Sequence, residues 1–125
     1  MFKQESIEGH PDLKIHIYEV TEDLSQLNNW FESCMKDIKW AEGTIKIFGK
    51  EHKIPRLQAW YADQNINYSY SGKKLVRNNW NNVLKEIKSK VELITSVKFN
   101  SVLGNLYRNG SDSMGLHSDD EKELG

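Results

Sequence analysis

The chain has 125 residues, 38% hydrophobic and 28% charged, with a formal net charge of -1. This length buries roughly two-thirds of the surface that the unfolded chain exposes, which suffices for a single core. The composition argues against a disordered tail and a multidomain enzyme. It also argues against a membrane protein, because no segment approaches the run of about 20 apolar residues that spans a bilayer. The lone Cys34 cannot form an internal disulfide, which is typical of a reducing compartment. We expect a cytoplasmic or nuclear protein.

The N-terminal third of the chain predicts a strand followed by a helix. Apolar and polar residues alternate over 13–18, which is the period of a half-buried strand. Thr21 is the predicted N-cap of the helix. From Leu24 to Ile38 the apolar residues recur at three-and-four spacing, so this helix should be amphipathic.

The middle of the chain predicts a hairpin. Alternation over 44–48 indicates a strand, and Gly49 with Lys50 predicts the turn into a further strand over 54–60. Pro55 lacks an N–H donor, so it should place that strand at a sheet edge or lie at the strand's start.

The remaining elements predict an α+β fold with strand-rich ends around two helices. Residues 68–72 form an extended segment that carries two tyrosines on one side, and the clearest helical stripe runs from Trp80 to Ile94. A strand is expected over 99–108, followed by a turn at Asn109-Gly110 and a short extended run over 114–119.

Positive charge is concentrated in the middle of the chain. Nine Lys or Arg and three acids lie between Arg56 and Arg108, a local surplus of +6. A basic surface suits a polyanion, because each Lys or Arg near a phosphate releases condensed counterions. The alternative is that these charges are the solvated faces of a loop and a helix.

His117 and Asp119 are the candidate metal ligands. Residues two apart on an extended chain point to the same side, so an imidazole nitrogen and a carboxylate oxygen could hold one metal ion. This pair would supply two ligands of the two-His-one-carboxylate triad that binds Fe(II). The alternative, which this pair by itself favours, is a surface His beside an acidic loop. Asn105 and Tyr107 share one face of the preceding strand and could hydrogen-bond a keto-acid cosubstrate. The alternative is that Tyr107 fills the core and Asn105 caps a turn.

Several segments, in the same order along the chain, resemble the AlkB family of Fe(II)/2-oxoglutarate-dependent nucleic-acid dealkylases. The resemblance covers residues from about Ile45 to the C-terminus and is carried by PRLQAWYAD (55–63), YSYSG (68–72) and FNSVLGNLYRNGSDSMGLHSDDEKELG (99–125). It implies oxidative demethylation of alkylated DNA or RNA, hence DNA repair, with Fe(II) and 2-oxoglutarate. The hydroxylated methyl group would leave as formaldehyde.

The resemblance also implies roles for individual residues. His117 and Asp119 would bind iron, and Asn105 and Tyr107 would bind 2-oxoglutarate. A damaged base must leave the stack before a metal can reach its methyl group. Tyr70 and the His117 ring would sandwich it. Its other contacts would come from Tyr68, Asp120, Glu121 and Arg56, and the nucleic-acid backbone would meet a basic patch of Lys73, Lys74 and Arg77.

The family also uses a distal His as the third iron ligand and Arg residues that clamp the cosubstrate. Neither residue type occurs in the six positions after Asp119. We therefore expect a single partial domain: residues 1–96 form the N-terminal and substrate-recognition part, and residues 97–125 begin a double-stranded β-helix, or jelly roll, whose barrel stays incomplete. Little turnover is expected from this chain without a missing C-terminal half. The alternatives are a noncatalytic nucleic-acid-binding fragment and a truncated gene product. The sequence leaves the oligomeric state open.

Overall fold

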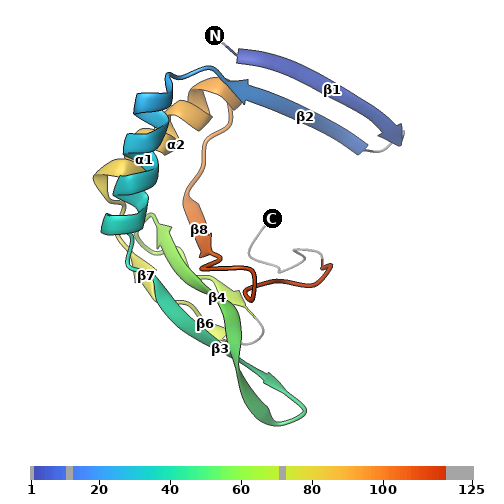
Figure 1. The fold of residues 1–125 in the computed structure, drawn as a ribbon, viewed down its shortest axis with the longest axis vertical. Helices are drawn as coiled ribbons and strands as arrows, with labels where there is room; N and C mark the ends of the chain where they lie inside the picture. The colour runs from blue at the N-terminus through green and yellow to red at the C-terminus, as the bar shows by residue number, and fades with distance from the viewer. Residues whose placement is uncertain (1, 11–12, 71–72, 118–125) are drawn as a thin grey trace. The chain divides into compact units, whose positions relative to one another are not determined.

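A computed structural model of the chain describes residues 2–10, 13–70 and 73–117, which contain both helices and strands (Figure 1). The chain divides into two compact units, one formed by residues 1–37 and 82–98 and the other by residues 38–81 and 99–125. No helix in the described part of the chain is long and apolar enough to cross a membrane. The presence of both helices and strands agrees with the mixed fold class that the sequence predicted.

The first unit contains one hairpin and two helices. Strand β1 (Phe2–His10) pairs antiparallel with β2 (Leu13–Val20), and helix α1 (Leu24–Asp37) packs against helix α2 (Asn82–Thr95). The strand expected over 13–18 and both expected helices are confirmed. Strand β1 was not predicted, because its sequence FKQESIEGH does not alternate regularly between apolar and polar residues.

The start of α1 corrects one prediction, since the N-cap is Asp23 rather than Thr21. The Asp23 carboxylate accepts a hydrogen bond from the Gln26 backbone N–H at 2.7 Å, and its carbonyl accepts from Leu27 N at 3.1 Å. A side-chain oxygen at this position satisfies one of the free N–H groups of the first helical turn. Its negative charge also lies at the positive end of the helix dipole.

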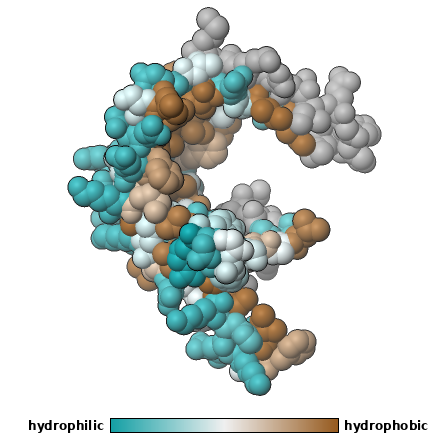
Figure 2. Space-filling model, in the orientation of Figure 1, coloured by the Kyte–Doolittle hydropathy of each residue, from teal (hydrophilic) through white to brown (hydrophobic). Residues whose placement is uncertain are grey.

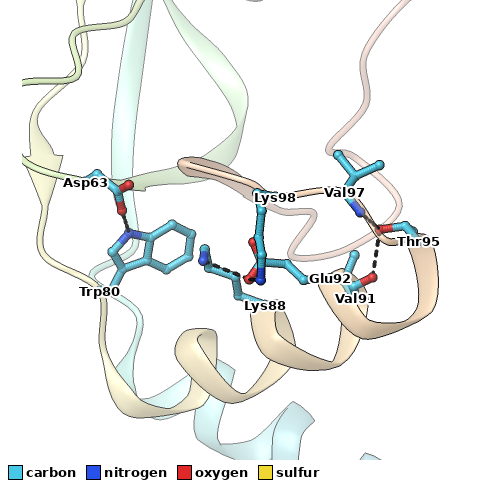
Figure 3. A network of polar contacts seen from close by, with 8 residues as sticks. All are labelled: Asp63, Trp80, Lys88, Val91, Glu92, Thr95, Val97 and Lys98. Atoms are coloured by element: carbon cyan, nitrogen blue, oxygen red, sulfur yellow. Dashed lines mark hydrogen bonds and ion pairs between the residues drawn. The ribbon is translucent and has the colours of Figure 1, made fainter.

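Helix α2 ends in a small polar cluster (Figure 3). The Glu92 carboxylate contacts Lys88 Nζ at 3.1 Å and Lys98 Nζ at 3.6 Å. The Thr95 hydroxyl donates to the Val91 carbonyl at 2.8 Å, one helical turn earlier. The helix ends at Thr95 because Ser96 has a left-handed backbone conformation, with φ of 57°.

The second unit is built on the long strand β4 (Lys50–Ala62), which has neighbours on both sides. β3 (Ala41–Ile47) is antiparallel to it, β7 (Arg77–Asn78) is parallel, and β8 (Ser101–Leu106) is antiparallel. A short hairpin pairs β5 (Ser69–Tyr70) with β6 (Lys73–Lys74). The strand expected over 99–108 is confirmed in its central part.

The sequence predicted that Pro55 lies in an edge strand or at the start of a strand. This prediction is wrong, because Pro55 lies inside β4, which has neighbours on both sides. The register with β3 shifts here: Thr44 pairs with Lys53, but Glu42 pairs with Leu57. The three residues around Pro55 therefore bulge opposite Gly43, and the ladder to β8 begins only at Leu57. A proline is tolerated at a bulge because no ladder hydrogen bond is required of its nitrogen.

The core of the second unit forms on both faces of β4. On one face Trp60 and Ala62 pack with Tyr68, and the partly buried Leu75 and Leu103 contact this cluster. On the other face the Trp40 ring covers β8 at Gly104, where a Cβ would come within 3.1 Å of the indole. A side chain at position 104 would therefore force the Trp40 ring to move by a few tenths of an ångström.

The turn predicted at Asn109-Gly110 is confirmed, but the extended run after it is not. The Asn109 side chain accepts from Ser111 N at 2.9 Å, and its carbonyl accepts from Asp112 N at 3.1 Å. Residues 113–117 form no strand, and the remainder of the predicted run lies outside the described residues. Up to residue 117, where the described part of the chain ends, no return strand follows this turn.

The N-cap of α1 can be tested by substitution. Asp23→Ala should lower the free energy of unfolding by about 1 kcal/mol, because the Gln26 N–H loses its acceptor. Asp23→Ser should preserve most of the stability, since a serine hydroxyl also caps. Chemical denaturation of the three chains measures both effects. Equal stability of the Ala and Ser variants would contradict this assignment.

Candidate functional site

A row of four polar side chains crosses from β4 to β8. Gln58 pairs with Asn105 in the antiparallel ladder, and their amides lie 3.2 Å apart. Arg56 Nη1 donates to the Tyr107 hydroxyl at 3.2 Å. Arg56 and Gln58 are 4% and 6% exposed, whereas Asn105 and Tyr107 are exposed. The two predicted cosubstrate residues therefore rest on a buried polar pair, and Tyr107 is not part of the core.

A cleft of about 470 Å³ lies over the same face of β4. Gln58, Trp60 and Leu103 contribute to its wall, together with Lys74 of β6 and the next residue, Leu75. Most of the lining is apolar and a few polar groups interrupt it, which is the usual character of a small-molecule site. The size also falls within the usual range for such sites.

The predicted base-contacting residue Tyr68 belongs to the aromatic cluster beside this cleft. Its ring lies 5.9 Å from the Trp60 ring at an interplanar angle of 44°, and the residue is 8% exposed. The Tyr68 carbonyl accepts from Leu75 N at 2.9 Å. Tyr70 is paired with Lys73 in the short hairpin that follows. Tyr68 therefore anchors the segment that carries Tyr70.

The loop that follows β8 is closed by an ion pair. Arg108 Nε contacts Asp112 Oδ2 at 2.8 Å, and Arg108 Nη2 donates to Oδ1 at 3.1 Å. The backbone N–H of Arg108 donates to the same carboxylate at 2.9 Å. These bonds lower the pKa of the Asp112 carboxyl below its ordinary value, with the side-chain hydrogen bond from Arg108 as the largest cause. The loop leads directly to His117.

Of the predicted iron ligands, only His117 lies within the described residues, while Asp119 lies outside them, as do Asp120 and Glu121. His117 is exposed, and its Nδ1 is 2.8 Å from the Gly115 carbonyl. If Nδ1 donates this bond, the lone pair resides on Nε2, the arrangement usual for a metal-binding His.

No group of three or more His, Cys, Asp or Glu that could hold a metal ion occurs among the described residues. The donor chemistry of His117 nevertheless fits Fe(II) as one ligand, and the polar row fits a carboxylate cosubstrate.

The three residues of the predicted basic patch differ in their surroundings. Arg77 Nη1 donates to the Ala62 carbonyl and to Asn79 Oδ1, both at 2.9 Å, so its guanidinium stabilises the end of β4. Lys74 is exposed and lines the cleft. Lys73 pairs with Tyr70. Of the described side chains in this patch, that of Lys74 is therefore better placed to meet a phosphate.

Phe48 is a further candidate for a contact with a binding partner, and it was not identified from the sequence. It occupies the two-residue turn between β3 and β4 and is fully exposed, at 103%. Phe48 and Gly49 both have left-handed backbone, with φ of 49° and 77°. Figure 2 shows apolar side chains at the tip of this hairpin, next to hydrophilic ones. The sequence signal was an aromatic residue directly before the turn glycine, where a polar residue is usual.

Comparisons with known proteins agree with the resemblance to AlkB. The 2OG-Fe(II) oxygenase superfamily matches residues 15–125. DNA oxidative demethylase ALKBH2 of Bos taurus is 36% identical over 110 residues, covering 86% of this chain and 40% of that protein. The Homo sapiens protein of that name is also 36% identical, with 42% of its length covered. Alpha-ketoglutarate-dependent dioxygenase alkB homolog 3 of Bos taurus is 39% identical over 82% of this chain and 36% of that protein. The chain spans about two-fifths of the length of these relatives.

The Arg108–Asp112 pair predicts a specific titration. Because the pKa of Asp112 is lower in the folded chain, the pair stabilises the loop above the ordinary aspartate pKa, and this stabilisation is lost as the pH falls through the lowered value. An NMR titration of the Asp112 carboxyl carbon should therefore give a midpoint below that of an unperturbed aspartate. Arg108→Gln should raise the midpoint toward the ordinary value. An unchanged midpoint in this variant would exclude Arg108 as the cause.

Proposed function

The chain belongs to the 2OG-Fe(II) oxygenase superfamily, and on this basis we propose that it forms part of an AlkB-like dioxygenase acting on N-alkylated bases in DNA or RNA. Members of this superfamily use Fe(II) and 2-oxoglutarate. The proposed reaction is oxidative dealkylation, in which the alkyl carbon is hydroxylated and leaves as an aldehyde. In the proposed fold, residues 97–125 begin a jelly roll that further chain completes, and residues 1–96 form the N-terminal and substrate-recognition part. The cytoplasm or the nucleus is the location that fits such a substrate.

The polar row across β4 and β8 is the observation that carries this proposal. Asn105 and Tyr107 can each donate a hydrogen bond, and the buried guanidinium of Arg56 lies directly behind Tyr107. Its described partners are the neutral groups of Gln58 and Tyr107, so its positive charge has no acidic partner among them. A buried cation whose partners among the described residues are neutral favours an anionic ligand nearby. A keto acid with two carboxylates meets this requirement.

The metal centre would be held by His117 and Asp119. When bound, iron would supply the oxidation of the alkyl carbon by dioxygen, with one oxygen atom transferred to that carbon and the other to the keto acid, which loses carbon dioxide. The chain's own residues bind and orient the reactants. Asn105 and Tyr107 would hold the cosubstrate, and the hydrogen bond between His117 Nδ1 and Gly115 would fix the ring so that Nε2 is directed to the metal.

The damaged base would stack between Tyr70 and the His117 ring. The anchoring of the preceding segment by Tyr68 supports this arrangement, because a base platform must be held firmly. Asp120 and Glu121 would face the polar edge of the base. Arg56 would order the pocket rather than contact the backbone, since it is 4% exposed. Among the basic residues, Lys74 would contact phosphate, with Lys73 and Arg77 beside it.

Binding of modified nucleic acid tests the proposed function. The chain should bind an oligonucleotide carrying one N-methylated base about tenfold more tightly than the same unmethylated oligonucleotide, because stacking in a preformed site discriminates the base. Fluorescence anisotropy at a fixed salt concentration measures the ratio. Equal affinities for the two oligonucleotides would contradict the proposal and would indicate a noncatalytic nucleic-acid-binding chain instead.

The exposed Phe48 predicts a preference for duplexes. An apolar side chain at the tip of a hairpin can enter between base steps and help to extrude a base. The free energy needed to unpair and unstack that base arises only in a duplex. Four Lys or Arg and two acids lie between residues 41 and 62, so the hairpin is also basic. Phe48→Ala should weaken binding to a methylated duplex about tenfold and binding to the single strand much less.

Leu24→Ala provides the matched control, because Leu24 is another exposed apolar residue, at 72%, on helix α1. This variant should bind both oligonucleotides as the unmodified chain does. A loss of equal size on duplex and single strand in Phe48→Ala would exclude a role in base extrusion.

A further inference from the structure

Gln58 occupies a central place in the polar row without any role assigned to it so far. It lies in the middle of β4, is 6% exposed, and pairs with Asn105 in the ladder to β8. Its amide lies between the Arg56 guanidinium and the Asn105 amide. A buried amide must match its donors and acceptors to its neighbours, so its orientation affects both of them.

Hydrogen bonding fixes which way the Gln58 amide faces. With Gln58 Nε2 directed at Arg56, the N–H donors of the amide would face the N–H donors of the guanidinium, and no hydrogen bond could form between them. With the amide turned, the Gln58 oxygen accepts from Arg56 Nη2 at 3.0 Å and from Nε at 3.1 Å. The same oxygen then lies 3.2 Å from the terminal amide atom of Asn105. Only a nitrogen can donate there, so the Asn105 amide turns together with Gln58.

Arg56 has a parallel effect on Tyr107. The guanidinium donates through Nη1 to the phenol oxygen at 3.2 Å, so this oxygen acts as an acceptor toward the protein. The phenol proton is therefore available in another direction. Asn105 likewise keeps a second N–H beyond the one that it donates to Gln58. Both side chains then present donors to a ligand.

We propose that Gln58 is a positioning residue that, together with Arg56, holds Asn105 and Tyr107 as hydrogen-bond donors toward a carboxylate ligand. This inference rests on the proposed function, in which that ligand is 2-oxoglutarate. Gln58 itself touches no ligand in this scheme. Its oxygen accepts hydrogen bonds from both the buried Arg56 guanidinium and the Asn105 amide. It thereby keeps Asn105 oriented with its nitrogen, rather than its oxygen, toward an anion.

The orientation can be measured in the chain without any ligand. NMR coupling across a hydrogen bond should connect Asn105 Nδ2 with the side-chain carbonyl carbon of Gln58. The reverse coupling, from Gln58 Nε2 to the side-chain carbonyl carbon of Asn105, would overturn the proposal. So would the absence of the first coupling in spectra that show the couplings of the β4–β8 backbone ladder.

Ligand affinity tests the consequence. Isothermal titration with 2-oxoglutarate should show that Gln58→Met weakens binding about tenfold, since Asn105 is then free to turn. Gln58→Glu keeps acceptors for Arg56 and Asn105, so it should restore most of this loss. Thermal unfolding of each variant separates the effect from a change in stability.

Tyr61→Phe is the matched control. Tyr61 is also buried in β4 but lies on the opposite face, where its hydroxyl accepts from Lys39 N at 3.0 Å. This variant loses one hydrogen bond and should bind 2-oxoglutarate normally. If Gln58→Met weakens binding no more than Tyr61→Phe does, the positioning role is excluded. If the unmodified chain does not bind 2-oxoglutarate, the carboxylate ligand and the proposed function both fail, and the NMR coupling still decides the orientation of Gln58.

Discussion

Six consecutive residue pairs join β4 to β8, from Leu57 with Leu106 to Ala62 with Ser101, and this register decides which side chains meet. Because successive residues of a strand point to opposite faces, a slip of one residue would carry Asn105 away from Gln58 and place it beside apolar groups. Trp60 and Leu103, which also pair, pack in the aromatic cluster on the cleft side. The burial of this cluster therefore fixes the register, and the register aligns the polar row.

The two strands of this ladder are far apart in the sequence. Between them lie the β5–β6 hairpin, β7 and the whole of α2, which belongs to the other compact unit. Local contacts help to hold together the two ends of this intervening segment, where β4 ends and β8 begins. Asp63 at the end of β4 accepts from Trp80 Nε1 at 2.8 Å, as Figure 3 shows, and its backbone N–H donates to the Asn100 carbonyl at 2.9 Å. Asp63 thus joins the exit from β4 to the entry into β8.

Periodicity in the sequence predicted α1, α2, β2, β8 and the β3–β4 hairpin, because each has a regular apolar pattern. It also placed Asn105 and Tyr107 on one face. It could not reveal Gln58, since a glutamine in a strand has no distinctive pattern and its importance depends on the register with β8. The N-cap was misplaced by two residues because Thr21 and Asp23 are both good caps, and only the geometry of the first turn distinguishes them. Pro55 was misplaced because a bulge leaves no regular signal.

The left-handed backbone at Phe48 has a consequence for how this hairpin can change. A residue with a Cβ in this conformation costs roughly 1 kcal/mol relative to glycine, and the exposed ring recovers nothing by burial. Glycine or asparagine would therefore make a more stable turn. If hairpin stability alone were selected, Phe48 would be replaced readily. Phe48 thus lowers the stability of the hairpin and leaves its ring exposed to solvent, where a partner outside this chain can contact it.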